Sequence, residues 1–132
     1  FRYKNYNTPM NNDIQIFVET DYIEDQSSSS DDRFVFAYTI TIENIGITPA
    51  KLLARHWVIT DSNGKVDEVE GDGVIGEQPI IQPGEAFSYT SGAILETDVG
   101  TMTGSYQMVN EEGQPFDADI PEFLLCVPRT LH

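Results

Sequence analysis

Positively charged side chains are scarce in this sequence: seven Lys and Arg stand against 22 Asp and Glu in 132 residues, a formal net charge of −15. Phosphate backbones and anionic lipid headgroups would repel such a chain, which excludes nucleic acid and membrane surfaces as expected partners. The imbalance is also uneven, because residues 67–132 contain one basic residue and 13 acidic ones. We interpret this acidic half as a solvated, solubilising surface or as the footprint of a cation or a basic partner.

Cysteine occurs once, at Cys126, so no internal disulfide can form. Its place in the apolar run 123–127 predicts a buried, unreactive thiol. No apolar stretch approaches the roughly 20 residues needed to span a bilayer, and no N-terminal segment has the pattern of a signal peptide. We therefore expect a soluble, cytoplasmic protein that does not insert into membranes.

Apolar residues are nevertheless plentiful, at 39% of the chain, with aromatics at 11%. That proportion, at this length, is enough for one compact core. We expect a single domain over residues 12–132. Residues 1–11 lack a clear pattern and are predicted to form a flexible N-terminal extension.

Alternation of apolar and polar side chains, with turn residues every 8 to 15 positions, is the main structural signal. It is clearest in residues 33–43, where Phe34, Phe36, Tyr38, Ile40 and Ile42 share one face. The predicted strands cover residues 13–20, 33–43, 51–61, 66–70, 86–91, 104–109 and 116–127. About seven short strands predict an all-β fold, an antiparallel β-sandwich of the immunoglobulin or fibronectin-III type.

Gly71, Gly73 and Gly76 match the G-x-G-x-x-G spacing of dinucleotide-binding loops. In such a site the glycines must open a helix whose N-terminal N–H groups hold pyrophosphate. Here prolines at 79 and 83 exclude that helix, and the preceding strand is acidic enough to repel phosphate. We predict a plain glycine-rich loop, or a loop whose glycines let some other ligand or partner approach the backbone closely.

Two further groups of side chains are candidate binding residues. If Trp57 faces the core with Leu53 and Ile59, then Arg55 shares that inner face and His56 does not. Arg55 would then form a structural ion pair, or Arg55 and His56 together would face a ligand.

The densest acidic cluster consists of Asp67, Glu68, Glu70 and Asp72, three of which share a strand face. It is a candidate weak site for Mg²⁺ or Co²⁺, although a row along one strand does not converge on an ion. A catalytic constellation is not recognisable, because the lone cysteine lies in an apolar run and no nucleophile elbow occurs. We therefore expect no enzymatic activity.

Several motifs occur in a fixed order along the chain: the runs 33–42 and 55–61, the glycine-rich segment 71–76, the Gln78-Pro79 and Pro83-Gly84 connection, and the runs 89–92, 100–108 and 128–132. Together they resemble the ApaG family of bacterial proteins. Similar domains occur in eukaryotic F-box proteins and in a polymerase-delta-interacting protein, for which a protein-binding role is assumed. The resemblance implies a fibronectin-III or immunoglobulin-like β-sandwich and an association with cobalt resistance and magnesium efflux. It brings no catalytic residues.

We predict a non-enzymatic binding module that acts through an unidentified protein partner or small ligand in divalent-cation handling. One alternative is a sensor or buffer that binds Co²⁺ or Mg²⁺ directly. Another is a phosphate- or nucleotide-binding domain that uses the G-x-G-x-x-G loop. No cofactor is firmly implied. Apolar edge strands allow a homodimer, although the negative charge opposes self-association.

Overall fold

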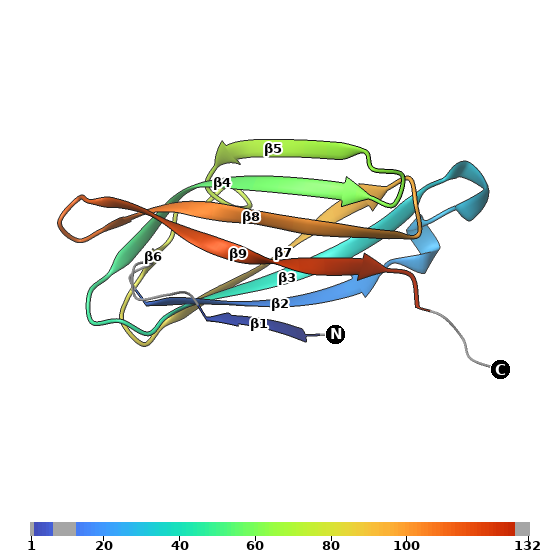
Figure 1. The fold of residues 1–132 in the computed structure, drawn as a ribbon. Coiled ribbons are helices and arrows are strands. Elements are labelled where there is room, and N and C mark those ends of the chain that lie inside the picture. The colour runs from blue at the N-terminus through green and yellow to red at the C-terminus, as the bar shows by residue number, and fades with distance from the viewer. Residues whose placement is uncertain (1, 7–12, 129–132) are drawn as a thin grey trace.

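The computed structural model consists of two antiparallel sheets packed face to face (Figure 1). It describes residues 2–6 and 13–128, with side chains from residue 13 onward. The four-stranded sheet has the order β1 (Arg2–Tyr6), β2 (Ile14–Tyr22), β3 (Phe34–Asn44), β7 (Ala86–Leu95). The five-stranded sheet has the order β5 (Val66–Asp72), β4 (Ala50–Asp61), β8 (Val99–Asn110), β9 (Pro115–Cys126), and the short β6 (Ile80–Ile81) also pairs with β4. The predicted β-sandwich is therefore confirmed.

No α-helix occurs among the described residues, which contain only two short 3-10 turns, η2 (Glu24–Gln26) and η3 (Ser29–Asp31). Accordingly, within the described ranges, no helix has the length and apolarity to cross a membrane. Part of the N-terminal stretch is ordered as β1, whose backbone pairs with β2 from Arg2↔Glu19 to Tyr6↔Gln15. Residues 1 and 7–12 lie outside the described residues, and the flexibility expected for this stretch stays a prediction.

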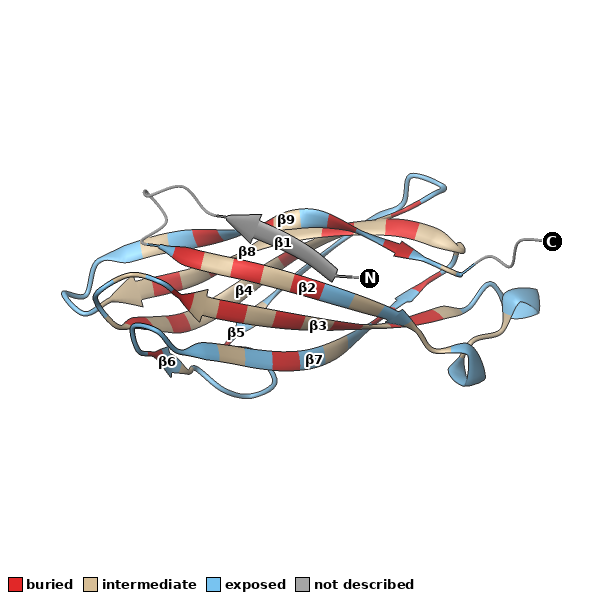
Figure 2. Ribbon diagram, turned by 90° about the horizontal axis from the view of Figure 1, so that it is seen from below, coloured by how far each residue is buried: buried red, intermediate tan, exposed pale blue. Residues whose placement is uncertain are grey.

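The core lies between the sheets and follows the alternation of the strands (Figure 2). In β3, Phe36, Tyr38, Ile40 and Ile42 are buried as predicted, and Phe34 packs against them half-buried. Trp57, 2% exposed, joins the layers through edge-on ring contacts with Tyr38 of the opposite sheet and with Tyr106 and Phe123 of its own. Aromatic rings in such tilted contacts contribute beyond the apolar area that they bury.

A β-bulge in β4 changes which leucine faces the core. The register of β4 on β8 shifts between Leu52 and Ala54. As a result Leu52 is fully buried and Leu53 is only half-buried, whereas the sequence predicted Leu53 on the inner face with Trp57. An inserted residue reverses the alternation on one side of a bulge, so the same strand can place both Leu52 and Trp57 inward.

The thiol of Cys126 is exposed, so the prediction of a buried cysteine is wrong. Phe123 and Leu125 of β9 point into the core, and period-2 alternation then turns Leu124 and Cys126 outward. The apolar run 123–127 reads as a fully buried strand, but one of its faces is in water.

A buried amide ties the loop between β3 and β4 to β6 at one end of the sandwich. Asn44 is fully buried, and its Nδ2 donates to the carbonyl oxygens of Thr48 and Ile81 at 2.8 and 2.9 Å. Its Oδ1 accepts from the N–H of Gly46 at 3.0 Å. All these partners are backbone groups, so this single side chain satisfies polar atoms that would otherwise be buried unpaired.

Candidate binding site

The glycine-rich segment forms a tight hairpin at the sheet edge. After β5 ends at Asp72, Val74 and Glu77 exchange two backbone hydrogen bonds of 2.9 Å, and no helix follows. Ile75 and Gly76, between them, have φ values of 44° and 79°. Two consecutive positive φ values define a type I′ turn. We call residues 71–77 the glycine-rich hairpin. It has none of the aligned N–H groups that a helix N-terminus offers to a pyrophosphate.

Besides Gly76 in the turn, the other two glycines of the motif also have identifiable structural roles. A Cβ at Gly71 would lie 2.9 Å from the nearest guanidinium nitrogen of Arg55, so the glycine lets the arginine cross close to the strand. Gly73 has a φ of 63°, and a Cβ there would overlap the carbonyl oxygen of Glu77. The spacing that resembles a nucleotide motif therefore serves a close side-chain approach, a left-handed backbone position and a turn.

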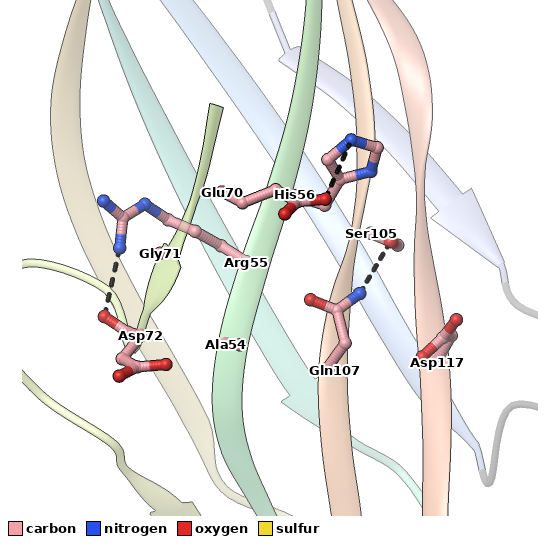
Figure 3. Close-up of a pocket in the computed structure, with 9 residues that line it drawn as sticks. All are labelled: Ala54, Arg55, His56, Glu70, Gly71, Asp72, Ser105, Gln107 and Asp117. Atoms are coloured by element: carbon pink, nitrogen blue, oxygen red, sulfur yellow. Dashed lines mark hydrogen bonds and ion pairs between the residues drawn. The ribbon is translucent and has the colours of Figure 1, made fainter. Parts of the chain in front are cut away.

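The side chain of Arg55 links β4 to the glycine-rich hairpin. Its Nη1 donates to the carbonyl oxygen of Asp72 at 3.1 Å (Figure 3). The same nitrogen donates to the carbonyl oxygen of Gly73 at 2.8 Å. The partners are thus backbone carbonyls, whereas the sequence predicted an ion pair or a ligand. Two features chosen separately from the sequence, the arginine and the glycine motif, form one unit.

Behind Arg55 lies a cluster of buried tyrosines from both sheets, Tyr38, Tyr89 and Tyr106, of which Tyr89 and Tyr106 share a hydroxyl–hydroxyl hydrogen bond. Burial raises the pKa of all three phenols above the usual value, and the positive charge of Arg55 lowers each pKa by a smaller amount. The indole Nε1 of the nearby Trp57 is buried without a hydrogen-bond partner. The interior beside the hairpin is therefore rich in neutral hydroxyl groups.

His56 points away from Arg55, to the outer face of the five-stranded sheet (Figure 3). Its Nε2 lies 3.4 Å from Oε1 of Glu68 and 3.8 Å from Oε1 of Glu70. Both carboxylates are mostly in water, with side chains 65% and 79% exposed, so each pair contributes little to stability. The side chains of Arg55 and His56 therefore leave β4 in different directions, although both residues line one depression, and their joint role as a ligand site stays a prediction.

An open depression of about 520 Å³ lies on this outer face. It is lined by residues of four strands and the hairpin: Ala54, Arg55, His56, Glu70, Gly71, Asp72, Ser105, Gln107 and Asp117. The last three come from β8 and β9, and nothing in the sequence marks them. They could be found only from the strand register, which places Gln107 beside both Ala54 and Asp117.

The four carboxylates of the acidic cluster divide between the two faces of β5. Glu68, Glu70 and Asp72 oppose Val58, His56 and Ala54 in the register with β4 and so follow the outer face, while Asp67 lies on the other. Among the described residues, no group of three or more His, Cys, Asp or Glu side chains is arranged to hold a metal ion. The cluster is a row of separate charges.

Two face-to-face antiparallel sheets, with a glycine-rich hairpin at the free edge of one, define an antiparallel β-sandwich domain of the immunoglobulin or fibronectin-III type. The model of the ApaG domain matches residues 24–110. The chain is 61% identical over 119 residues to protein ApaG of Thiobacillus denitrificans, covering 90% of this chain and 94% of that protein. This chain belongs to the ApaG family.

Other relatives agree with that assignment. An Escherichia coli protein ApaG is 56% identical over 119 residues, covering 90% of this chain and 95% of its own length. A crystal structure described as the ApaA protein of Bordetella pertussis superposes with a TM-score of 0.87 at 50% identity, covering 89% of this chain and 96% of that one. These names establish the family and the fold, and they state no ligand or reaction.

Proposed function

We propose that this chain is a non-enzymatic binding module that acts through a protein partner, with the glycine-rich hairpin as its contact surface. The observation that supports the proposal is the conformation of Ile75, a β-branched residue held at a φ of 44° with 56% of its surface exposed. Asn, Asp and Gly are the usual residues at this turn position. A large apolar side chain that is both strained and exposed contributes nothing evident to folding, which favours a role in binding.

The hairpin also holds this side chain in a defined place. Val74, next to the tip, is fully buried in the core. The N–H of Gly73 donates to the carbonyl oxygen of Leu53 at 2.8 Å, and Nε2 of Gln78 donates to the same oxygen at 2.8 Å. A contact residue that is already fixed before binding loses little entropy on association, and this raises affinity.

The acidic outer face indicates the charge of the partner. Glu68, Glu70 and Asp72 lie on β5, next to the hairpin, and residues 67–132 carry only one basic side chain. A basic partner would be steered toward this edge, and its association rate would fall as salt is added. We propose a partner with an apolar pocket for Ile75 and Lys or Arg around it.

The proposed binding serves divalent-cation handling, as the family resemblance implies. The test uses an Escherichia coli strain that lacks its own ApaG, which is 56% identical to this chain. The tagged chain, Ile75→Asn and the matched control Ile80→Asn are compared for captured proteins and for growth in cobalt. We expect Ile75→Asn to abolish the capture of one specific partner protein and to abolish growth in cobalt. We expect the control Ile80→Asn to retain both. Retention of both by Ile75→Asn contradicts the proposal, and so does their loss in the control.

Direct cation binding is the second candidate, for which Glu68 and Glu70 lie near His56, at 3.4 and 3.8 Å, although these three side chains are not arranged to hold an ion. Calorimetric titration of Co²⁺ and then Mg²⁺ at about 0.15 M salt tests it, because screening there reduces exposed charge interactions beyond roughly 8 Å. Saturable binding near one ion per chain, lost when the four carboxylates become amides, would favour this function. Pyrophosphate in the same titration tests the nucleotide-binding alternative, for which the hairpin geometry offers no support.

A further inference from the structure

β7 is an edge strand without the features that usually protect an edge. Its ten residues contain no charged side chain and no proline, although the chain carries a net charge of −15. By contrast, the edge strand β5 has four carboxylates in seven residues, and β9 has two prolines and three carboxylates. Natural sheets protect exposed edges with charge, proline or bulges because a bare edge pairs with other strands.

The direction of the backbone groups of β7 follows from its register with β3. The N–H of Asn44 donates to the carbonyl oxygen of Glu85, and the pairing then continues from Glu43↔Ala86 to Phe34↔Leu95 without a shift. Hydrogen-bonded and non-bonded pairs alternate in an antiparallel ladder. The odd-numbered residues of β7 therefore bond to β3, and the N–H and C=O groups of the even-numbered residues point outward.

The even-numbered residues, whose backbone N–H and C=O groups point away from β3, are all exposed: Ala86, Ser88, Thr90, Gly92 and Ile94. No element of the described structure pairs with this edge (Figure 2). Four of them, Ala86, Ser88, Thr90 and Gly92, have a small side chain or none, and the hydroxyls of Ser88 and Thr90 bond to Thr41 and Thr39 of β3, each at 2.8 Å. Ile94 is the one large side chain among them, and it is 57% exposed. A polypeptide backbone could therefore approach β7 from residue 86 to residue 92.

We infer that β7 binds an extended segment of a partner protein as an added antiparallel strand, in which an uncharged stretch is flanked by Lys or Arg. The flanking charges follow from the ends of the strand, because Glu85 precedes β7 and Glu96 follows it. Both carboxylates have exposed side chains, although Glu85 also accepts from the N–H of Gln82 and Glu96 from Nζ of Lys65. Main-chain bonds supply affinity in this mode, and side chains supply specificity.

A second copy of this chain fits the same edge less well. An antiparallel pair of β7 strands centred on Thr90 places Leu95 opposite Glu85 of the other copy, so that Glu96 of one copy comes one residue after the position that faces Glu85 of the other, at both ends. Carboxylates brought this near to one another repel, and the net charge of −15 on each copy adds repulsion. A segment flanked by Lys or Arg would instead place positive charges near Glu85 and Glu96, and the electrostatic interaction at both ends of β7 would be attractive.

The test is an amide NMR titration of the full chain with a synthetic peptide of alternating Thr and Val flanked at each end by two lysines. Before addition, we expect the amide protons of the even-numbered β7 residues to exchange rapidly and those of the odd-numbered residues, which bond to β3, to exchange slowly. We expect the peptide to slow exchange at the even positions by at least tenfold. The same peptide with terminal glutamates, or with N-methyl groups on its pairing edge, should not.

Substitutions at one position separate the backbone from the side chain. Thr90→Pro removes a backbone N–H that points outward and should lower the affinity for the peptide by about tenfold. Thr90→Val loses only the hydroxyl bond to Thr39 and should leave that affinity unchanged. Circular dichroism confirms folding of both. Absence of binding, or perturbations confined to other surfaces, overturns the inference. Protection of the even positions that grows with protein concentration, without peptide, assigns the edge to a second copy instead.

The β7 edge and the glycine-rich hairpin are separate surfaces, and the inference does not rest on the function proposed above. Ile75→Asn should leave peptide binding to β7 unchanged while it abolishes the hairpin contact. Failure of the peptide to bind, with capture through Ile75 intact, would remove this inference and leave the proposed function standing.

Discussion

Replacement of Ile75 by Asn should stabilise the protein relative to the same replacement at Ile80, although both exchange an exposed isoleucine for a polar residue. The two side chains are nearly matched in exposure, at 56% and 58%. They differ in backbone, because Ile75 has a φ of 44° in the hairpin and Ile80 lies in the strand β6. The loss of apolar contact is therefore similar at the two sites and largely cancels in the comparison.

The expected magnitude follows from the backbone term. A left-handed conformation costs an ordinary L-residue about 1–2 kcal/mol, and Asn adopts it more readily. Loss of the partly buried isoleucine costs roughly 1 kcal/mol at either site, taken as a little under half of the value for full burial. Ile75→Asn should therefore be neutral or slightly stabilising. Ile80→Asn should destabilise, with the additional cost of placing Asn in a strand. The variants should differ by about 1.5 kcal/mol.

Urea unfolding, followed by the fluorescence of the single tryptophan, measures this difference directly. Trp57 is 2% exposed and lies in the core, so its emission reports global unfolding of either variant. Equal midpoints for the two variants, or a greater loss of stability for Ile75→Asn, would refute the strain argument. That result would also remove the physical reason for assigning Ile75 to binding.

Three further predictions concern the framework. Gly104→Ala should destabilise the protein by about 3 kcal/mol, because the added Cβ overlaps a backbone carbonyl of β4. Gly92→Ala is the control, since its Cβ would make only an ordinary contact of 3.5 Å, and urea unfolding midpoints compare the two variants. Asn44→Ala should cost about 3 kcal/mol by leaving buried carbonyls unpaired, and hydrogen exchange should accelerate at residues 45–49 and 79–82 first. Burial raises the pKa of the three buried tyrosines, so folding favours their neutral form. Their contribution to the free energy of unfolding is fully present below the usual phenol pKa of 10.0 and falls as the pH rises above it. Absorbance at alkaline pH should show three phenols ionising only as the protein unfolds.

The parts of the fold that the sequence predicted are those with strict alternation. In residues 33–43 every second side chain is a large apolar one, and a shift by one residue would expose all of them, so only one register is stable. Several strands were predicted too short, among them β5, which extends to Asp72, β7, which extends to Leu95, and β8, which begins at Val99. Glycines at 71, 92, 100 and 104 weaken a strand signal, yet those at 71, 100 and 104 allow close approach of neighbouring groups such as Arg55 and the backbone of β4.

Prediction of the site was limited by contacts between distant segments. The sequence identified Arg55 and the glycine motif, and it correctly argued against a helix after residue 76. Their contact depends on the β4–β5 register, which aligns Arg55 with Gly71. The outward direction of Cys126 and the burial of Leu52 depend on alternation and on a bulge, neither of which a local apolar run reveals. The positive φ of Ile75 belongs to the type I′ turn of the glycine-rich hairpin. The sequence did not predict it, because Asn-Gly and Asp-Gly are the usual pairs in such turns and Ile-Gly is not.

The two sheets are also interleaved along the chain, and this affects folding on the ribosome. Thr39 and Thr90, which share a hydroxyl hydrogen bond, are 51 residues apart in sequence, and β4, β5 and β6 are synthesised between them. When β7 emerges to complete the first sheet, β4 still lacks β8, which is its partner on the other side. The first sheet is therefore completed only after β4, β5 and β6 have been synthesised, and the second sheet only when β8 and β9 follow. The apolar face that carries Trp57 therefore stays incompletely buried in the nascent chain until β8 and β9 have been synthesised. The complete domain should then fold in one cooperative step.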